Sequence, residues 1–176
     1  MPSTMELLMR FTPAALALSA VLAVTASVGH GAPPAPLDAR AAALVAQGRT
    51  ALGAGDTDKA IDQFEAAMAI QPGHVAILLN LAEATRKQGM QGKALHYYRQ
   101  ALKVEPENQY AIAGEGVTLV EKGAVEKARR NLARLQQLCG GTCPPAQELA
   151  AAIQKGPTPQ VVTAEQVKPQ PVVTQN

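Results

Sequence analysis

Apolar residues recur three and four positions apart along residues 38–154, the spacing that places them on one face of an α-helix. Leu78, Leu81 and Ala82 form one such face. Glycine and proline interrupt the pattern at regular intervals, which marks where helices end. The hydrophobic content comes from alanine, leucine and valine, with only 3% aromatic residues, which favours close helix packing over a β-sandwich or barrel. The pattern predicts an all-α fold with helices at 38–53, 57–70, 75–88, 91–104, 109–122, 125–138 and 145–154.

The same pattern returns every 34 residues, so that 41–74, 75–108 and 109–142 align without gaps. Equivalent positions of the three aligned copies form columns. Small residues in two of these columns predict that two antiparallel helices cross closely, and a large apolar residue in a third column fills the space beside them. A recurring glycine predicts a left-handed turn at the end of each first helix, and a proline ends the second helix. These columns are Gly48, Ala82 and Gly116; Ala60, Ala94 and Ala128; Phe64, Tyr98 and Leu132; Gly55, Gly89 and Gly123; and Pro72 and Pro106, followed by Gly140.

The period and these residues resemble the tetratricopeptide repeat. The resemblance implies an α-solenoid of three helix hairpins, here a domain spanning 38–154, whose first helices line a concave face that binds peptides or protein segments. The third copy departs from the family pattern, with Leu135 and Gly140 where alanine and proline are usual. The helix predicted at 145–154 has one apolar face and is expected to cap this last repeat, because such repeats cannot bury their faces alone.

The family's groove positions, carried onto this sequence, identify candidate partner-binding residues. We expect Asn80 to form a hydrogen bond with a ligand backbone, and Arg49, Arg86 and Lys87 to bind carboxylates. These residues are explained about equally well as solvated surface charges. Val45, Tyr110 and Gly114 stand where a clamp for chaperone tails has polar or basic groups, so that ligand class is not expected. The candidate groove residues are Arg49, Leu79, Asn80, Glu83, Arg86, Lys87, Tyr110 and Val117.

The two ends of the chain differ from this repeat region. Residues 1–32 contain Arg10, an apolar run at 11–28 and then small residues, which is typical of a cleaved secretory signal peptide. An uncleaved membrane anchor is the alternative, since a largely apolar run of 18 residues is near the lower limit for a spanning helix. Residues 33–37 form a proline-rich linker, and 155–176 are expected to be a disordered tail. We therefore expect an exported protein, in the bacterial periplasm.

Cys139 and Cys143 are the only cysteines, and they lie after the last repeat helix. Export places them in an oxidising compartment, where a structural disulfide is the expected state. It would replace the missing proline in fixing the turn into the cap helix. Free or regulatory thiols, and redox or metal chemistry, are the alternatives.

Charge and candidate chemistry narrow the function classes. The net charge of +2 gives no electrostatic case for nucleic-acid binding. Lys59, Lys93 and Lys127 recur on the second helices and are expected to be solvated on the convex side rather than to bind an anionic partner. Tyr97 is expected at the surface or in an interface. His96 has no nucleophile or carboxylate arranged around it in sequence, and no cofactor or metal motif is present.

The sequence favours a non-enzymatic interaction scaffold or assembly factor with a protein or peptide partner. Two other hypotheses remain open. One is a thiol-active redox protein that uses Cys139 and Cys143. The other is a membrane-anchored structural subunit of an envelope complex, which requires residues 11–28 to be retained as an anchor.

Overall fold

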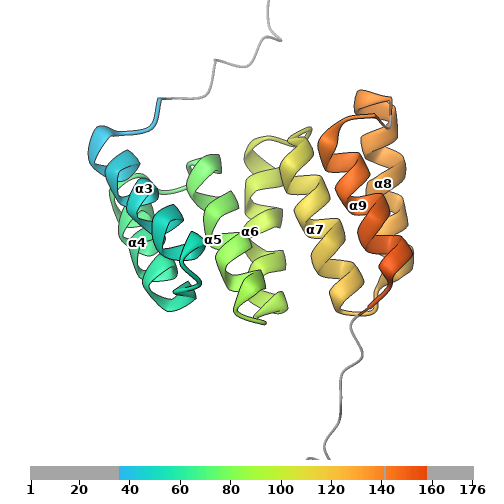
Figure 1. The fold of residues 1–176 in the computed structure, drawn as a ribbon. Helices are drawn as coiled ribbons and strands as arrows, with labels where there is room; N and C mark the ends of the chain where they lie inside the picture. The colour runs from blue at the N-terminus through green and yellow to red at the C-terminus, as the bar shows by residue number, and fades with distance from the viewer. Residues whose placement is uncertain (1–35, 141, 158–176) are drawn as a thin grey trace, which may run out of the picture. The chain divides into compact units, whose positions relative to one another are not determined.

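The computed structural model describes residues 36–140 and 142–157, and the predicted signal segment and most of the predicted tail lie outside these residues. Within the described residues the fold is all-α, with seven helices and no strand (Figure 1). Each helix begins and ends within one residue of its predicted range. The helices are α3 (Ala39–Gly53), α4 (Thr57–Ile70), α5 (Val75–Lys87), α6 (Gln91–Val104), α7 (Gln109–Glu121), α8 (Val125–Cys139) and α9 (Pro144–Lys155).

Local capping explains where several helices begin. The Asp38 carboxylate accepts hydrogen bonds from the backbone N–H groups of Arg40 and Ala41 at the start of α3. The side chains of Asp56, His74 and Asn108 accept equivalent bonds at the starts of α4, α5 and α7. These bonds satisfy N–H groups that have no partner within the helix.

The recurring glycine of each repeat has the left-handed conformation that the sequence predicts. Gly55, Gly89 and Gly123 have φ angles of 84°, 81° and 77°, and each follows a first helix. A side chain is strongly disfavoured at such angles, whereas glycine has no Cβ to clash. Each first helix therefore ends at a fixed place and the chain reverses into the second helix.

Consecutive helices pack against one another as three hairpins, α3–α4, α5–α6 and α7–α8, stacked in chain order (Figure 1). The stacking contacts between hairpins join α4 to α5 and α6 to α7. Helix α9 packs on both α7 and α8 and closes the end of the stack. The arrangement is the predicted solenoid of three hairpins with a capping helix, although Lys155, expected in the tail, is the last residue of α9.

The core is built where the small and large columns of the repeats meet. Ala60, Ala94 and Ala128 have no exposed surface, and Phe64 is likewise fully buried. A Cβ added to Gly48 would lie 2.4 Å from the ring of Phe64, so only glycine leaves room for that ring. The absence of a side chain at this position sets the spacing of the first hairpin.

Tyr97, expected at the surface or in an interface, is not a surface residue. It is only 7% exposed and belongs to the core cluster of the first two repeats. Its ring meets His96 edge-on, and the ammonium of Lys93 lies 5.9 Å from its centroid. Helix α6 packs on α5 and on α7, and both Tyr97 and Tyr98 belong to the buried cluster formed there.

Candidate functional site

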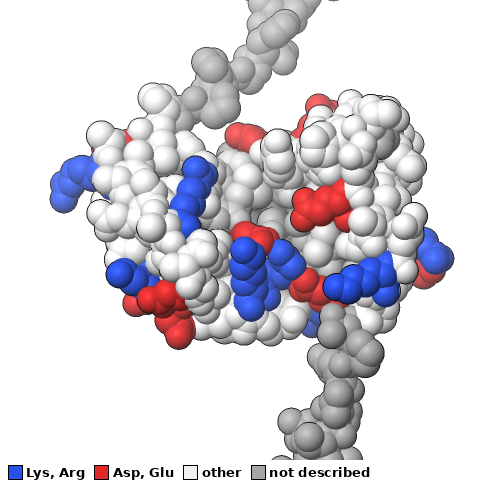
Figure 2. Space-filling view, viewed as in Figure 1, with Lys and Arg blue, Asp and Glu red and all other residues white. Residues whose placement is uncertain are grey.

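A hollow of about 320 Å³ lies on the face formed by the first helices. Figure 2 shows this face with acidic and basic side chains gathered around the hollow. Helices α5, α7 and α9 line it, and α6 contributes one tyrosine. We call it the groove, and its lining residues are Leu79, Glu83, Arg86, Tyr98, Tyr110, Ala113, Gly114, Val117 and Glu148.

Five of the eight predicted partner residues meet in the groove: Leu79, Glu83, Arg86, Tyr110 and Val117. They are brought together because α5 and α7 are equivalent helices of adjacent repeats. Leu79 and Val117 supply apolar surface, and Val117 is 9% exposed. Tyr110 is 67% exposed. The groove thus combines a small apolar surface with an accessible aromatic ring and charged groups.

Arg86 is bound to two glutamates of the chain itself. Its Nη2 donates to both carboxylate oxygens of Glu83 at 2.8 and 2.9 Å, and its Nε donates to Glu83 Oε2 at 3.0 Å. Its Nη1 donates to Glu121 Oε1 at 2.5 Å, which joins α5 to α7. Burial opposes the guanidinium charge, but the two carboxylates outweigh it and raise the pKa of Arg86. The guanidinium therefore links the second repeat to the third.

Tyr98 brings a phenol from the second helix to the same place. Its side chain is buried, and its hydroxyl donates to Glu83 Oε2 at 3.3 Å. Burial and the negative charge of Glu83 both raise the pKa of this phenol, because they disfavour the phenolate. Tyr98 is thus a neutral donor that helps hold the Glu83 carboxylate.

The remaining predicted residues lie beside the groove. Arg49 Nε donates to Asn80 Oδ1 at 3.0 Å, and Asn80 Nδ2 donates to the carbonyl of Ala76 at 2.5 Å. Lys87 Nζ lies 3.7 Å from Glu83 Oε1 on the same helix. Arg49 and Asn80 thus link α3 to α5, and neither is among the residues that line the hollow.

Four lining residues are not among the candidate partner residues: Tyr98, Ala113, Gly114 and Glu148. Tyr98 was expected to fill the core, and its hydroxyl reaches the groove because α6 packs directly against α7. Glu148 lies on α9, for which the sequence predicts only a capping role. Its neighbour Leu149 is fully buried. A charged residue directly beside this buried leucine is the sequence feature that could have identified Glu148.

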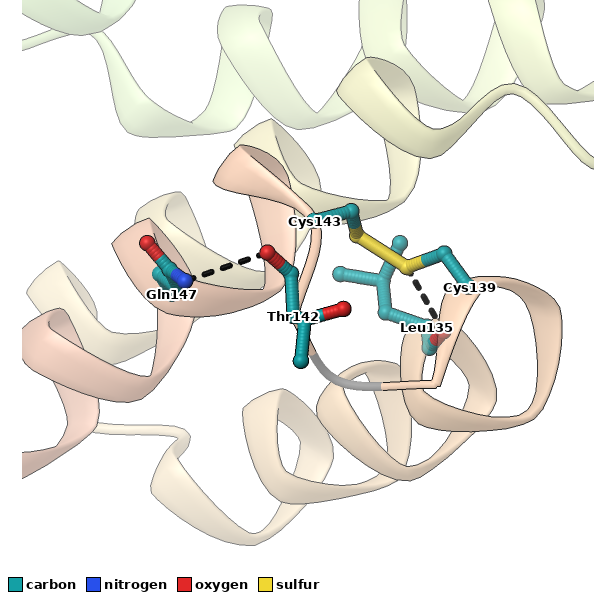
Figure 3. The surroundings of a disulfide bond; sticks show 5 residues. All are labelled: Leu135, Cys139, Thr142, Cys143 and Gln147. Carbon is teal, nitrogen blue, oxygen red and sulfur yellow. Dashed lines mark hydrogen bonds between the residues drawn. A yellow bond between two sulfur atoms is a disulfide. The ribbon is translucent and has the colours of Figure 1, made fainter.

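A disulfide joins Cys139, the last residue of α8, to Cys143, the N-cap residue of α9 (Figure 3). Their Cα atoms are 5.9 Å apart, and the sulfur of Cys139 lies 3.1 Å from the carbonyl oxygen of Leu135. Both cysteines are partly buried against the core of the third repeat. The Gln147 side chain donates to the Thr142 carbonyl at 3.1 Å across the same turn. The bond thus lies at the junction that positions α9, and with it Glu148.

A second hollow, of about 810 Å³, lies between the end of α4 and α6. Its lining includes His96, Tyr97 and Lys93, whose Nζ donates to Glu65 Oε1 at 3.0 Å. The Nε2 atom of His96 lies 2.9 Å from the amide nitrogen of Gln100.

In the part of the chain that the structure describes, no group of three or more His, Cys, Asp or Glu residues is arranged to hold a metal ion. None of the helices described there is long and apolar enough to cross a membrane.

Similarity to known proteins rests on the repeats. Two tetratricopeptide repeat family models match residues 51–90 and 75–108. No curated protein matches the chain.

Among solved structures, the Sgt2 tetratricopeptide domain from Aspergillus fumigatus has a TM-score of 0.62 at 21% identity, covering 84% of this chain and 95% of that one. The first such domain of Spaghetti (RPAP3), solved with the HSP90 peptide SRMEEVD, has a TM-score of 0.59 at 21% identity, covering 66% and 92%. The Yersinia enterocolitica type III secretion chaperone SycD, solved with a peptide of the translocator YopD, has a TM-score of 0.56 at 18% identity, covering 65% and 86%. The two family matches identify tetratricopeptide repeats within residues 51–108, and the solved structures share the fold of the described residues.

Proposed function

We propose that this protein is a non-catalytic interaction module that holds a segment of a partner protein in the groove. The observation that carries the proposal is the meeting of five predicted partner residues around one hollow on the first-helix face. Two proteins of the same fold were solved with peptides bound. A partner segment would pack on Leu79 and Val117 and against the exposed ring of Tyr110.

We further propose that the protein is exported, in a bacterium to the periplasm, and acts there as a scaffold or assembly factor. The support is the signal-like pattern of residues 1–32 and a cysteine pair suited to an oxidising compartment. The mass of the mature N-terminus tests cleavage directly. A chain that retains residues 11–28 in the membrane would instead be an anchored subunit.

A thiol-active role is the other candidate, and the position of the cysteines argues against it. Both cysteines pack against the core of the third repeat. Reactive cysteines, by contrast, usually occupy accessible, electropositive sites. Thiol titration of the native oxidised protein at a series of redox potentials separates the two roles. A structural disulfide resists reduction at potentials where a catalytic pair opens.

Site-specific crosslinking tests the groove. The photoreactive residue p-benzoylphenylalanine is placed at Tyr110 in one variant and at Val104 in the other. Both side chains are exposed, by 67% and 57%, but only Tyr110 lines the groove. We expect Tyr110→p-benzoylphenylalanine to crosslink one partner segment, identified by mass spectrometry, in the cells that make the protein.

The variant at Val104 is the matched control, since it exposes the same photoreactive group elsewhere on the domain. Crosslinking of the same partner with equal yield from both positions would show that the groove is not the binding site. Absence of any adduct at Tyr110 would count against the proposed function.

A further inference from the structure

We propose that the partner segment inserts an arginine or lysine side chain into the groove, where its charge meets Glu148. This inference rests on the proposed function and specifies its partner: an extended segment with one basic residue beside an apolar one. Four observations on the groove carry it.

The first observation concerns the arginine of the groove. All three side-chain nitrogens of Arg86 already donate to Glu83 or Glu121. An acidic ligand would have to displace one of these internal carboxylates, which leaves a half-buried glutamate without its partner. Breaking such a pair is costly. Arg86 is therefore a poor receptor for a carboxylate.

The second observation is the balance of charge. The groove and its ion pairs contain three carboxylates, those of Glu83, Glu121 and Glu148, against two cations, those of Arg86 and Lys87. Within residues 36–140 and 142–157, Glu148 takes part in no ion pair, and its side chain is exposed at the groove. One negative charge is thus available to a ligand.

The third observation is an unused acceptor deeper in the same network. Glu121 receives Arg86 on one carboxylate oxygen, while its other oxygen is buried and accepts no hydrogen bond from the described residues. Buried acceptors are normally satisfied. The hydrogen-bond network around the groove can therefore accept a bond from a ligand's donor more readily than it can donate to a ligand's acceptor.

The fourth observation is the shape and lining of the hollow. Its volume of about 320 Å³ is near the lower end of ligand pockets, roughly 300–1,000 Å³, so it suits one or two side chains. The methylene stem of an arginine or lysine can pack on Leu79, Ala113 and Val117 while its charged end stays near water. The exposed ring of Tyr110 offers a face on which a guanidinium or ammonium group is attracted.

Nuclear magnetic resonance titration of the full chain tests the charge preference. The probes are three acetylated and amidated heptapeptides of sequence Gly-Gln-Leu-X-Val-Gln-Gly, in which X is arginine, norleucine or glutamate. We expect the arginine peptide to shift the amide signals of Ala113, Gly114 and Glu148. An exposed ion pair corresponds to a Kd lower than that of the norleucine peptide by about two- to fivefold, and the glutamate peptide should bind most weakly.

The variant Glu148→Gln keeps the shape of the side chain and removes its charge. It should raise the Kd of the arginine peptide to that of the norleucine peptide. Glu126→Gln removes an equal charge from an exposed position outside the groove lining and should leave the Kd unchanged.

Each other outcome has a defined meaning. Equal binding of the arginine and norleucine peptides would overturn the charge preference but leave the groove as a binding site. Tightest binding of the glutamate peptide would overturn it by reversing the sign. If no peptide shifts the groove amides at millimolar concentration, the inference is also overturned, and crosslinking at Tyr110 decides separately whether the proposed function survives.

Discussion

The ring of Tyr98 rests directly on the backbone of α7 at Gly114. A Cβ added to Gly114 would lie 2.3 Å from Tyr98 Cζ and 2.6 Å from its hydroxyl oxygen. The ring can approach only because this position of the third repeat has no side chain. The contact places the hydroxyl at the groove, within 3.3 Å of Glu83. One glycine thus connects the packing of two repeats to the composition of the proposed binding surface.

Gly114→Ala is therefore expected to destabilise the protein by about 1–3 kcal/mol, the usual cost of overpacking. The ring of Tyr98 must move, and its hydroxyl would lose Glu83. Urea unfolding followed by circular dichroism measures the change. Gly53→Ala is the control, because that helical glycine has nothing within 4 Å of an added Cβ. Equal stability of the two variants would mean that the ring accommodates the methyl group without cost.

Because Arg86 pairs with both Glu83 and Glu121, we expect its substitution to reduce the free energy of unfolding more than substitution of an exposed arginine does. Arg86→Met should reduce the free energy of unfolding by about 2–4 kcal/mol, because it removes the ion-pair partner of Glu121 and leaves Glu83 with only Tyr98 and the more distant Lys87. Arg129→Met removes one partner of the exposed Arg129–Glu126 pair and should cost less than about 1 kcal/mol. Similar losses in the two variants, measured by urea unfolding, would rule out a structural role for Arg86.

The raised pKa of Tyr98 predicts a loss of stability in alkali. The unfolded phenol releases its proton near its ordinary pKa of about 10, whereas burial and Glu83 keep the folded phenol protonated to higher pH. Stability from this group is complete below about pH 10 and declines as the pH rises toward the folded pKa, because deprotonation then favours the unfolded chain.

The variant Tyr98→Phe isolates this effect. At pH 8 it should be less stable than the native protein by about 1 kcal/mol, through loss of the hydrogen bond to Glu83. The difference should narrow between pH 10 and pH 11. The pKa of Lys93 is also raised, chiefly by its hydrogen bond to Glu65, but both proteins contain that lysine and its contribution cancels. A difference independent of pH would contradict the prediction.

The disulfide is expected to stabilise α9 rather than the whole stack. It closes a loop of only a few residues, for which the chain-entropy estimate is about 2 kcal/mol. In the double variant Cys139→Ser with Cys143→Ser, hydrogen exchange should accelerate in α9 while α3 and α4 remain protected. Reduced native protein should behave like the double variant. Unchanged exchange in α9 would show that Leu149 and its neighbours hold the cap without the disulfide.

Local chemistry explains why the helices were predictable. Each boundary depends on residues close to it in sequence, such as Asp56 at the start of α4 or Gly89 after α5. The small and large columns likewise act within one hairpin, as Gly48 and Phe64 do. A period of 34 residues repeats these local rules, so the stacking of the hairpins follows from the sequence pattern.

The groove was only partly predictable, since its residues take partners from other repeats. The family's positions located Glu83 and Arg86, but not that Glu121, 35 residues later, would bind the guanidinium. The burial of Tyr97 also depends on other repeats. Of two adjacent tyrosines on a helix, one is usually buried and the other exposed, but here neighbouring helices cover both.

The sequence by itself determined the all-α class, the three repeats and the helix boundaries, because these depend on helical periodicity and on backbone conformations that glycine and proline specify locally. The face on which the groove lies followed from the resemblance to the tetratricopeptide repeat. Only the tertiary structure decided which charges remain available in the groove. Arg86 is neutralised by glutamates of two repeats, and α9 adds the carboxylate of Glu148. Such pairings depend on distances between helices far apart in the chain, which periodicity alone does not specify.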